Sequence, residues 1–120
     1  MIQAVLPTMR KNKKGHILNV TSMGGFITMP GISYYCGSKF ALEGISESLG
    51  KEVKKLGIKV TAIAPGQFRT DWAGRSMKRS CRFISDYDEI MNPIWEARHQ
   101  KSGIQPGKPS KAAEAVLKVI

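Results

Sequence analysis

The sequence predicts an α/β protein built around a parallel sheet. Two short runs rich in Ile, Leu and Val, at 16–22 and 58–65, have the composition of buried strands, and the segment between them has the clearest helical periodicity in the chain. Strand, long helix, strand is a crossover unit, in which the strands are parallel and the connection is right-handed. Because parallel sheets are covered by helices on both faces, these elements form only part of such an architecture.

Each predicted strand has a recognisable boundary. The first, "HILNVTS", follows the basic, glycine-ended turn "KNKKG". The second, "IKVTAIAP", is stopped by Pro65 and Gly66, because proline cannot donate to a strand ladder and glycine favours a turn.

The helix between the strands is predicted from its periodicity. Its charged positions Glu43, Glu47, Lys51 and Lys54 lie on the side opposite the apolar ones. Gly57 supplies the left-handed position that commonly ends a helix. The residues predicted to form the buried face are Phe40, Leu42, Ile45, Leu49, Val53 and Leu56.

The segment 71–109 is basic and irregular. We expect a short helix near "DYDEIMNPIWEARHQ", with Pro93 as a candidate kink, followed by the breaker-rich stretch "SGIQPGKPS". A last helix is predicted to begin with Ser110 as its N-cap and to run through "KAAEAVLKVI".

Length and composition predict one globular unit, 1–120, or a piece of a larger one. The chain has 120 residues, of which 42% are hydrophobic and 23% are charged, which argues against disorder. No apolar run approaches the roughly 18 residues of a membrane helix, and the opening lacks the order of a signal peptide. Two separate cysteines and two histidines lack the spacing of a metal site, so we expect free thiols, no metal and a cytoplasmic location.

The chain is strongly basic, with a formal net charge of +10 from nineteen basic and nine acidic residues. Such a surplus attracts nucleic acid, an acidic membrane surface or a phosphate-bearing small molecule. The basic residues are scattered in short runs with few aromatics between them, which favours an ordinary solvated surface. The sequence therefore predicts no nucleic-acid and no membrane partner.

The stretch "SYYCGSKF" places two tyrosines before a lysine. On a helix, Lys39 shares a face with the residue four positions earlier, which is Tyr35 and not Tyr34. A phenol exchanges protons poorly at neutral pH unless a nearby positive charge stabilises its anion. By spacing alone, packing is the commoner role of such a tyrosine. However, Ser22 and "PGQFRT" follow the two strands, so all three features converge on the edge where parallel sheets bind ligands.

The motifs "GHILNVTS", "YYCGSK" and "IAPGQFRT", in this order, resemble the short-chain dehydrogenase/reductase family of NAD(P)-dependent oxidoreductases. The resemblance implies a three-layer, doubly wound Rossmann-type parallel sheet. It covers the carboxyl-terminal half of that fold, without the glycine-rich first βαβ unit and the residue that selects NAD or NADP. The family's catalytic asparagine would fall upstream of Met1.

The resemblance also implies roles for individual residues. Tyr35 would be the general acid/base, Lys39 would stabilise its anion and hold the nicotinamide ribose, and Ser22 would hydrogen-bond the substrate oxygen. The residues implied to bind the cofactor are Tyr35, Lys39, Pro65, Gly66, Phe68 and Thr70. By themselves, Ser22 could equally cap a loop and Pro65-Gly66 could be a simple turn.

The residues around these motifs are given lesser roles. Tyr34 and Cys36 are expected to pack in the interior. Met23, Phe68, Trp72 and the segment 71–109 are implied to form a variable substrate lid, although Trp72 could also be a surface anchor.

We therefore expect an oxidoreductase that acts on a small-molecule alcohol or carbonyl compound with NADP or NAD, forming a homo-oligomer or pairing with a complementing chain. The alternative is a truncated, catalytically silent chain that acts as an interaction or oligomerisation module. A basic nucleic-acid binder is the third reading, and no basic helix or aromatic platform is organised for it.

Overall fold

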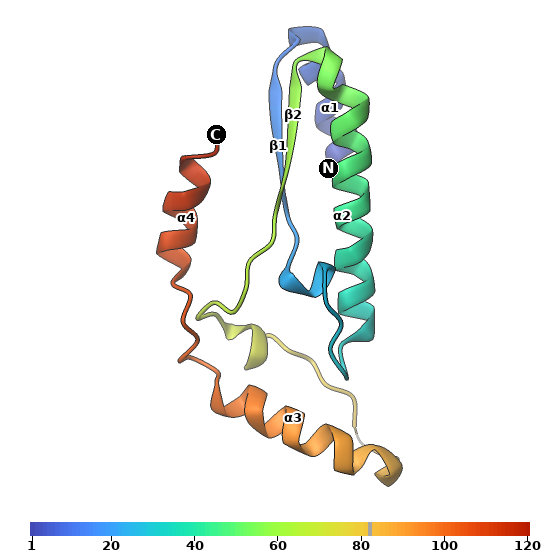
Figure 1. The fold of residues 1–120 in the computed structure, drawn as a ribbon, viewed down its shortest axis with the longest axis vertical. Helices are drawn as coiled ribbons and strands as arrows, with labels where there is room; N and C mark the ends of the chain where they lie inside the picture. The colour runs from blue at the N-terminus through green and yellow to red at the C-terminus, as the bar shows by residue number, and fades with distance from the viewer. Residues whose placement is uncertain (82) are drawn as a thin grey trace. The chain divides into compact units, whose positions relative to one another are not determined.

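The computed structural model describes residues 1–81 and 83–120. They form two compact units, Met1–Pro65 and Gly66–Ile120. Figure 1 shows the elements coloured along the chain, and each unit is described by itself below.

The first unit contains the predicted crossover. Helix α1 (Ile2–Asn12) is followed by strand β1 (Gly15–Val20), helix α2 (Ser33–Val53) and strand β2 (Ile58–Ile63) (Figure 1). β1 and β2 pair in parallel, from Gly15 opposite Ile58 to Val20 opposite Ile63. This confirms the parallel α/β prediction.

Both strands are shorter than predicted, which leaves residues 21–22 and 64–65 in loops at the carboxyl ends. Thr21 follows β1 directly and is still hydrogen-bonded to β2. Its backbone N–H donates to the Ile63 carbonyl over 2.7 Å, and its hydroxyl donates to the same oxygen over 3.0 Å. The chain then turns at Ser22 into the 3₁₀ turn η1 (Met23–Gly25).

The core of this unit lies between the sheet and the two helices. It consists of Ile17 from β1, Ile58 from β2, and Leu49 and Val53 from α2. Helix α1 was not predicted from the sequence, yet it covers the same cluster with three partly buried side chains, Ile2, Leu6 and Met9.

Three residues of the predicted buried face are exposed instead, two of them in α2 and the third in the turn that follows it. Phe40, Ile45 and Leu56 are 43%, 51% and 41% exposed. The face towards the sheet instead includes Ser46, which is only 5% exposed. Ser46 Oγ accepts a hydrogen bond from Asn19 Nδ2 of β1 over 2.8 Å and donates to the Leu42 carbonyl over 2.6 Å. The contact between α2 and β1 therefore includes the hydrogen-bonded pair Asn19 and Ser46, where a hydrophobic pattern would predict apolar side chains.

The end of α2 follows the prediction. The helix tightens into the 3₁₀ turn η2 (Lys54–Leu56), and Gly57 adopts a left-handed conformation with φ 74°. A Cβ at Gly57 would lie within 2.2 Å of the Lys13 carbonyl oxygen, so the turn before β1 packs against the turn before β2.

The second unit contains α3 (Asp88–Gln100) and α4 (Pro109–Leu117), with short 3₁₀ turns at Asp71–Ala73 (η3) and Ser85–Tyr87 (η4). The helix predicted near 86–100 is confirmed, with Pro93 inside it. Ser110 is not the N-cap of α4. Lys108 is the cap, because Pro109 has the fixed φ and missing N–H that suit the first helical position.

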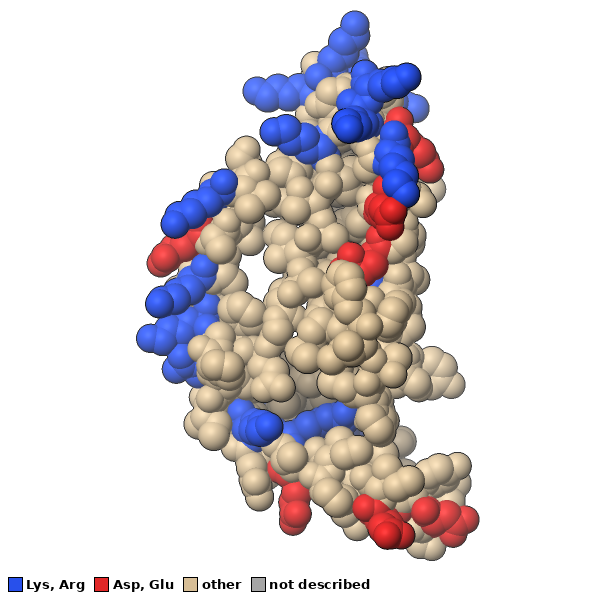
Figure 2. All heavy atoms as spheres, viewed as in Figure 1, with Lys and Arg blue, Asp and Glu red and all other residues tan. Residues whose placement is uncertain are grey.

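Charge is unevenly distributed over the surface. Figure 2 shows Lys and Arg gathered at the end of the first unit where α1 and α2 terminate. Within the residues that the structure describes, no helix is long and apolar enough to cross a membrane. Cys36 and Cys81 are free thiols, as expected, and no group of three potential metal ligands occurs in the same described residues.

Candidate active site

Tyr35 and Lys39 lie one turn apart at the start of α2. The Lys39 Nζ atom is 5.8 Å from the centroid of the Tyr35 ring. Tyr34, in contrast, is 96% exposed, so the prediction that it packs in the interior is wrong. Cys36 is 2% exposed, as predicted. Successive helical residues turn by about 100°, so Tyr34 and Cys36 point in nearly opposite directions. Because Cys36 is buried, Tyr34 faces solvent.

Lys39 also connects the helix to the sheet. Its ammonium donates a hydrogen bond of 2.9 Å to the Val20 carbonyl, at the last residue of β1. An ammonium has three N–H donors, so this bond fixes the side chain without using all of its donors. Lys39 is therefore held at the carboxyl edge of the sheet, beside Tyr35.

Ser22 lies at the same edge, in the turn that follows β1. It is 8% exposed, and its Oγ accepts a hydrogen bond of 3.1 Å from the Gly24 backbone N–H. The capping role considered for this serine is thus present. Accepting one bond leaves the hydroxyl proton available for donation, so a cap can also bind an oxygen atom.

Two glycines that sequence reasoning did not assign bring these groups together. A Cβ at Gly24 would lie 3.1 Å from Tyr35 Cε1 and 3.6 Å from Ser22 Oγ, so Gly24 sits between them. A Cβ at Gly25 would lie 3.1 Å from the Lys39 carbonyl oxygen. The available signal was the glycine pair directly after Ser22, which allows η1 to approach the backbone of α2.

Pro65 is hydrogen-bonded to the loop that contains Ser22. Its carbonyl accepts a hydrogen bond of 3.0 Å from the Met23 N–H. The structure therefore places Ser22, Tyr35, Lys39 and Pro65 at one edge of the first unit, beyond the carboxyl ends of both strands.

The other predicted cofactor residues, Gly66, Phe68 and Thr70, belong to the second unit. Thr70 Oγ1 accepts a long hydrogen bond of 3.4 Å from the Trp72 N–H and so begins η3. Phe68 pairs with Gly107 in an isolated parallel bridge. These contacts are local, and the cofactor roles of the three residues stay predictions.

The groups at the carboxyl edge fit the nicotinamide end of a dinucleotide better than its phosphates. The Lys39 ammonium and the Ser22 hydroxyl are hydrogen-bond donors suited to neutral and sugar-type oxygens, and each has an N–H or O–H beyond the bond described above. Nowhere does the sequence contain the glycine spacing G-x-G-x-x-G that allows a backbone to cradle a pyrophosphate.

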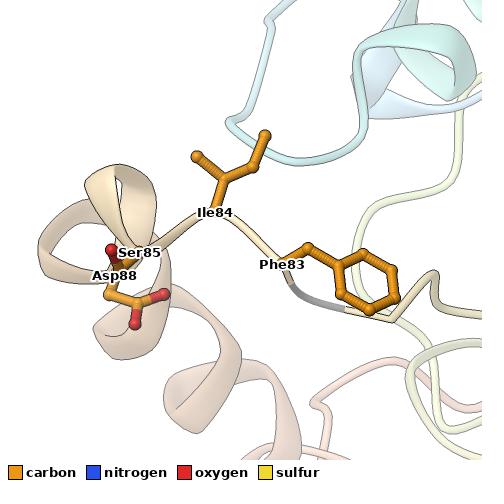
Figure 3. A pocket seen from close by; sticks show the side chains of 4 residues that line it. All are labelled: Phe83, Ile84, Ser85 and Asp88. Atoms are coloured by element: carbon orange, nitrogen blue, oxygen red, sulfur yellow. The ribbon is translucent and has the colours of Figure 1, made fainter.

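The second unit contains a shallow pocket that is separate from these residues. It is lined by Phe83, Ile84, Ser85 and Asp88, with Phe83 and Ile84 pointing in different directions (Figure 3). Phe83 is 89% exposed and Ile84 is 60% exposed. None of the predicted site residues lines it, so we do not regard it as the active site.

Comparison with known proteins identifies the family. The model for the short chain dehydrogenase family matches residues 1–80. The chain is 44% identical over 119 residues to Oxidoreductase BOA17 of Botryotinia fuckeliana, and 49% identical over 123 residues to a 3-ketodihydrosphingosine reductase of Bacteroides thetaiotaomicron. These matches cover 98% and 100% of this chain but 43% and 45% of the relatives, so the chain spans less than half of their length.

Solved structures give the same result. A short-chain dehydrogenase from Streptomyces avermitilis matches with a TM-score of 0.77 and 39% identity, over 94% of this chain and 40% of that one. A gluconate 5-dehydrogenase from Burkholderia cenocepacia, in complex with NADP and tartrate, matches with a TM-score of 0.58 and 28% identity, over 60% of this chain and 28% of that one. With its parallel crossover and with Ser22, Tyr35 and Lys39 at one sheet edge, the chain belongs to the short-chain dehydrogenase family.

Proposed function

We propose that this chain carries the proton-transfer half of an oxidoreductase site, which interconverts an alcohol and a carbonyl compound with NAD or NADP. One observation carries the proposal. Ser22 Oγ and the Tyr35 ring flank Gly24, and Lys39 Nζ is 5.8 Å from the centroid of that ring. A hydroxyl donor, a phenol and a fixed positive charge are the groups needed to stabilise and protonate a substrate oxygen.

Each residue has a distinct task in the proposal. Ser22 donates a hydrogen bond to the substrate oxygen and holds it beside Tyr35. During reduction, Tyr35 gives its hydroxyl proton to that oxygen, and during oxidation it takes the proton back. Lys39 supplies the positive charge that stabilises the resulting phenolate. When bound, the nicotinamide supplies or accepts a hydride at its C4 atom.

The proposed cofactor residues are those that the family resemblance implies. Lys39 would hold the nicotinamide ribose, while Pro65, Gly66, Phe68 and Thr70 would contact the nicotinamide itself. Similarity to a solved NADP complex supports a nicotinamide cofactor. The 49% identity to a 3-ketodihydrosphingosine reductase supports a ketone substrate, with a long-chain amino ketone as the first compound to test.

A silent interaction module is the second candidate. Within the described residues, β1 and β2 form a two-stranded sheet, so each strand has one edge without a strand partner. Such edges pair readily with another chain. This candidate predicts a stable complex with a second protein and no binding of nicotinamide dinucleotides.

Isotope transfer in the protein as its own cells make it tests the proposal. The purified protein is supplied with NADH or NADPH deuterated at the transferring position and with a panel of ketones. We expect deuterium on the carbinol carbon of the alcohol product. Failure to bind either dinucleotide, together with a stable hetero-oligomer, would favour the interaction module. Binding of the cofactor without transfer to any ketone would contradict the proposed reaction.

A further inference from the structure

The end of the first unit opposite the candidate active site carries a dense group of positive charges, which we call the basic tip (Figure 2). It comes from two short segments, 10–14 and 54–59, which contain no acidic residue. All of its cations are exposed: Arg10, Lys11, Lys13, Lys14, Lys54, Lys55 and Lys59.

Parallel pairing brings the two segments together. Gly15 lies opposite Ile58, so the turns that precede β1 and β2 are neighbours at the amino end of the sheet. The contact is close, because a Cβ at Gly57 would lie 2.2 Å from the Lys13 carbonyl oxygen. Basic runs that are some forty residues apart in the sequence therefore form one surface.

Helix capping explains only part of this charge. Arg10 and Lys11 are in the last turn of α1, and Lys54 and Lys55 are in η2, where cations stabilise the helix carbonyl ends. Lys13 is the C-cap residue of α1, whereas Lys14 and Lys59 lie outside these helix ends and have no such role.

The nearby acidic groups do not neutralise the tip. Glu47 pairs with Lys51, and the hydrogen bond from Lys51 lowers the pKa of Glu47. Glu52 lies on α2 between these residues and the tip. Among the described residues, none of the seven tip cations forms a salt bridge within 4.0 Å.

The composition of the tip and the helix ends present there favour a bilayer over a nucleic acid. Leu56 is 41% exposed between Lys55 and Gly57, which places an apolar side chain among the lysines. Lysines around an exposed leucine suit the anionic headgroups and outer acyl region of a membrane. Nucleic-acid surfaces typically add aromatic stacking or helix N-termini, whereas segments 10–14 and 54–59 contain no aromatic residue and the helices present their carboxyl ends here.

We propose that the basic tip docks the protein on the surface of an anionic phospholipid bilayer. This departs from the sequence-based expectation of no membrane partner, which considered the basic runs separately. Docking through the tip leaves Ser22, Tyr35 and Lys39 at the opposite end of the sheet, so the proposal is independent of the proposed reaction.

Vesicle flotation of the full chain tests the proposal. The vesicles contain phosphatidylcholine, either alone or mixed with phosphatidylglycerol. We expect flotation only with the anionic vesicles, with a strong decrease as salt is raised. The triple variant K14Q/K54Q/K55Q should reduce partitioning about a hundredfold, since each lysine near an anionic surface contributes about fivefold.

A matched control removes the same charge elsewhere. The variant K108Q/K111Q/K118Q changes three exposed lysines in the second unit and should keep most of the binding. Far-UV circular dichroism establishes that both variants are folded. Leu56→Ser should weaken the part of vesicle binding that remains at high salt, because it removes the apolar contact between Leu56 and the acyl region of the bilayer.

Three outcomes would overturn the proposal. The first is equal loss of binding in both triple variants, which would indicate that net charge alone is responsible. The second is absence of flotation with anionic vesicles. The third is tighter binding of duplex DNA or RNA that competes with vesicles and is lost in the tip variant, which would make the tip a nucleic-acid surface.

Discussion

Tyr34 and Tyr35 are adjacent in the sequence but have opposite surroundings. Tyr34 is 96% exposed, whereas Tyr35 lies against Gly24 and below the Lys39 ammonium. Helical geometry was sufficient to choose between them, because the four-residue spacing to Lys39 is a property of the backbone. The contact of Tyr35 with Gly24 was not predictable in this way, because it depends on how η1 folds onto α2.

Gly25 should be important for the geometry of the site. Gly25→Ala would place a methyl group 3.1 Å from the Lys39 carbonyl oxygen and push η1, with Ser22, away from α2. We expect kcat to fall about tenfold to a hundredfold, because catalysis is sensitive to displacements on the order of 1 Å. Steady-state kinetics measures the effect. The control is Gly37→Ala, since no atom lies within 4 Å of its added Cβ, and equal activity of the two variants would contradict this role of Gly25.

The two cysteines should react at very different rates. Cys36 is 2% exposed within α2, and Cys81 is exposed. A thiol reagent such as Ellman's reagent should therefore modify one cysteine quickly in the native protein and the second only in denaturant. Cys81→Ser should remove the fast phase. Rapid modification of both thiols in the folded protein would contradict the burial of Cys36.

The turn between α2 and β2 gives a sharp test of backbone packing. Gly57→Ala introduces a left-handed alanine and a clash with the Lys13 carbonyl, so we expect a loss of at least about 1–3 kcal/mol in the free energy of unfolding. Gly44→Ala is the matched control. No atom lies near its added Cβ, and a helical alanine should stabilise by about 0.5–1 kcal/mol. Denaturant unfolding measures both changes, and an unaffected Gly57→Ala variant would refute the close approach of the two turns.

The secondary-structure elements show what sequence patterns can and cannot predict. Both strands, α2, α3 and the glycine end of α2 were predictable, because periodicity and turn chemistry are local. Helix α1 was missed because Pro7 and the short apolar opening conceal its pattern, and its buried face becomes evident only against the core. Ser46 was missed on the buried face of α2 because its burial goes with a hydrogen bond to Asn19 of β1, a tertiary contact that hydrophobic periodicity does not reveal.

At the scale of the whole molecule, the described residues contain the groups proposed for proton transfer, but the sequence lacks a motif for binding a pyrophosphate. The first unit holds a phenol, a lysine and a serine at one sheet edge, while the sequence contains no phosphate-cradling glycine motif. This agrees with the comparisons, in which the chain matches less than half of each curated relative described above. The same unit carries the basic tip at its other end, so any surface docking and the proposed chemistry can be tested with different variants.

Paired tyrosine variants test the central proposal most directly. In the protein as its own cells make it, turnover of NADPH or NADH with a reducible ketone is compared for wild type, Tyr35→Phe and Tyr34→Phe, each folded to the same extent by circular dichroism. We predict that Tyr35→Phe lowers kcat by about a hundredfold or more, because the proton donor is lost, while Tyr34→Phe changes it less than about twofold. Retained turnover in Tyr35→Phe, or equal losses in both variants, would contradict the assignment of Tyr35 as the proton-transfer residue.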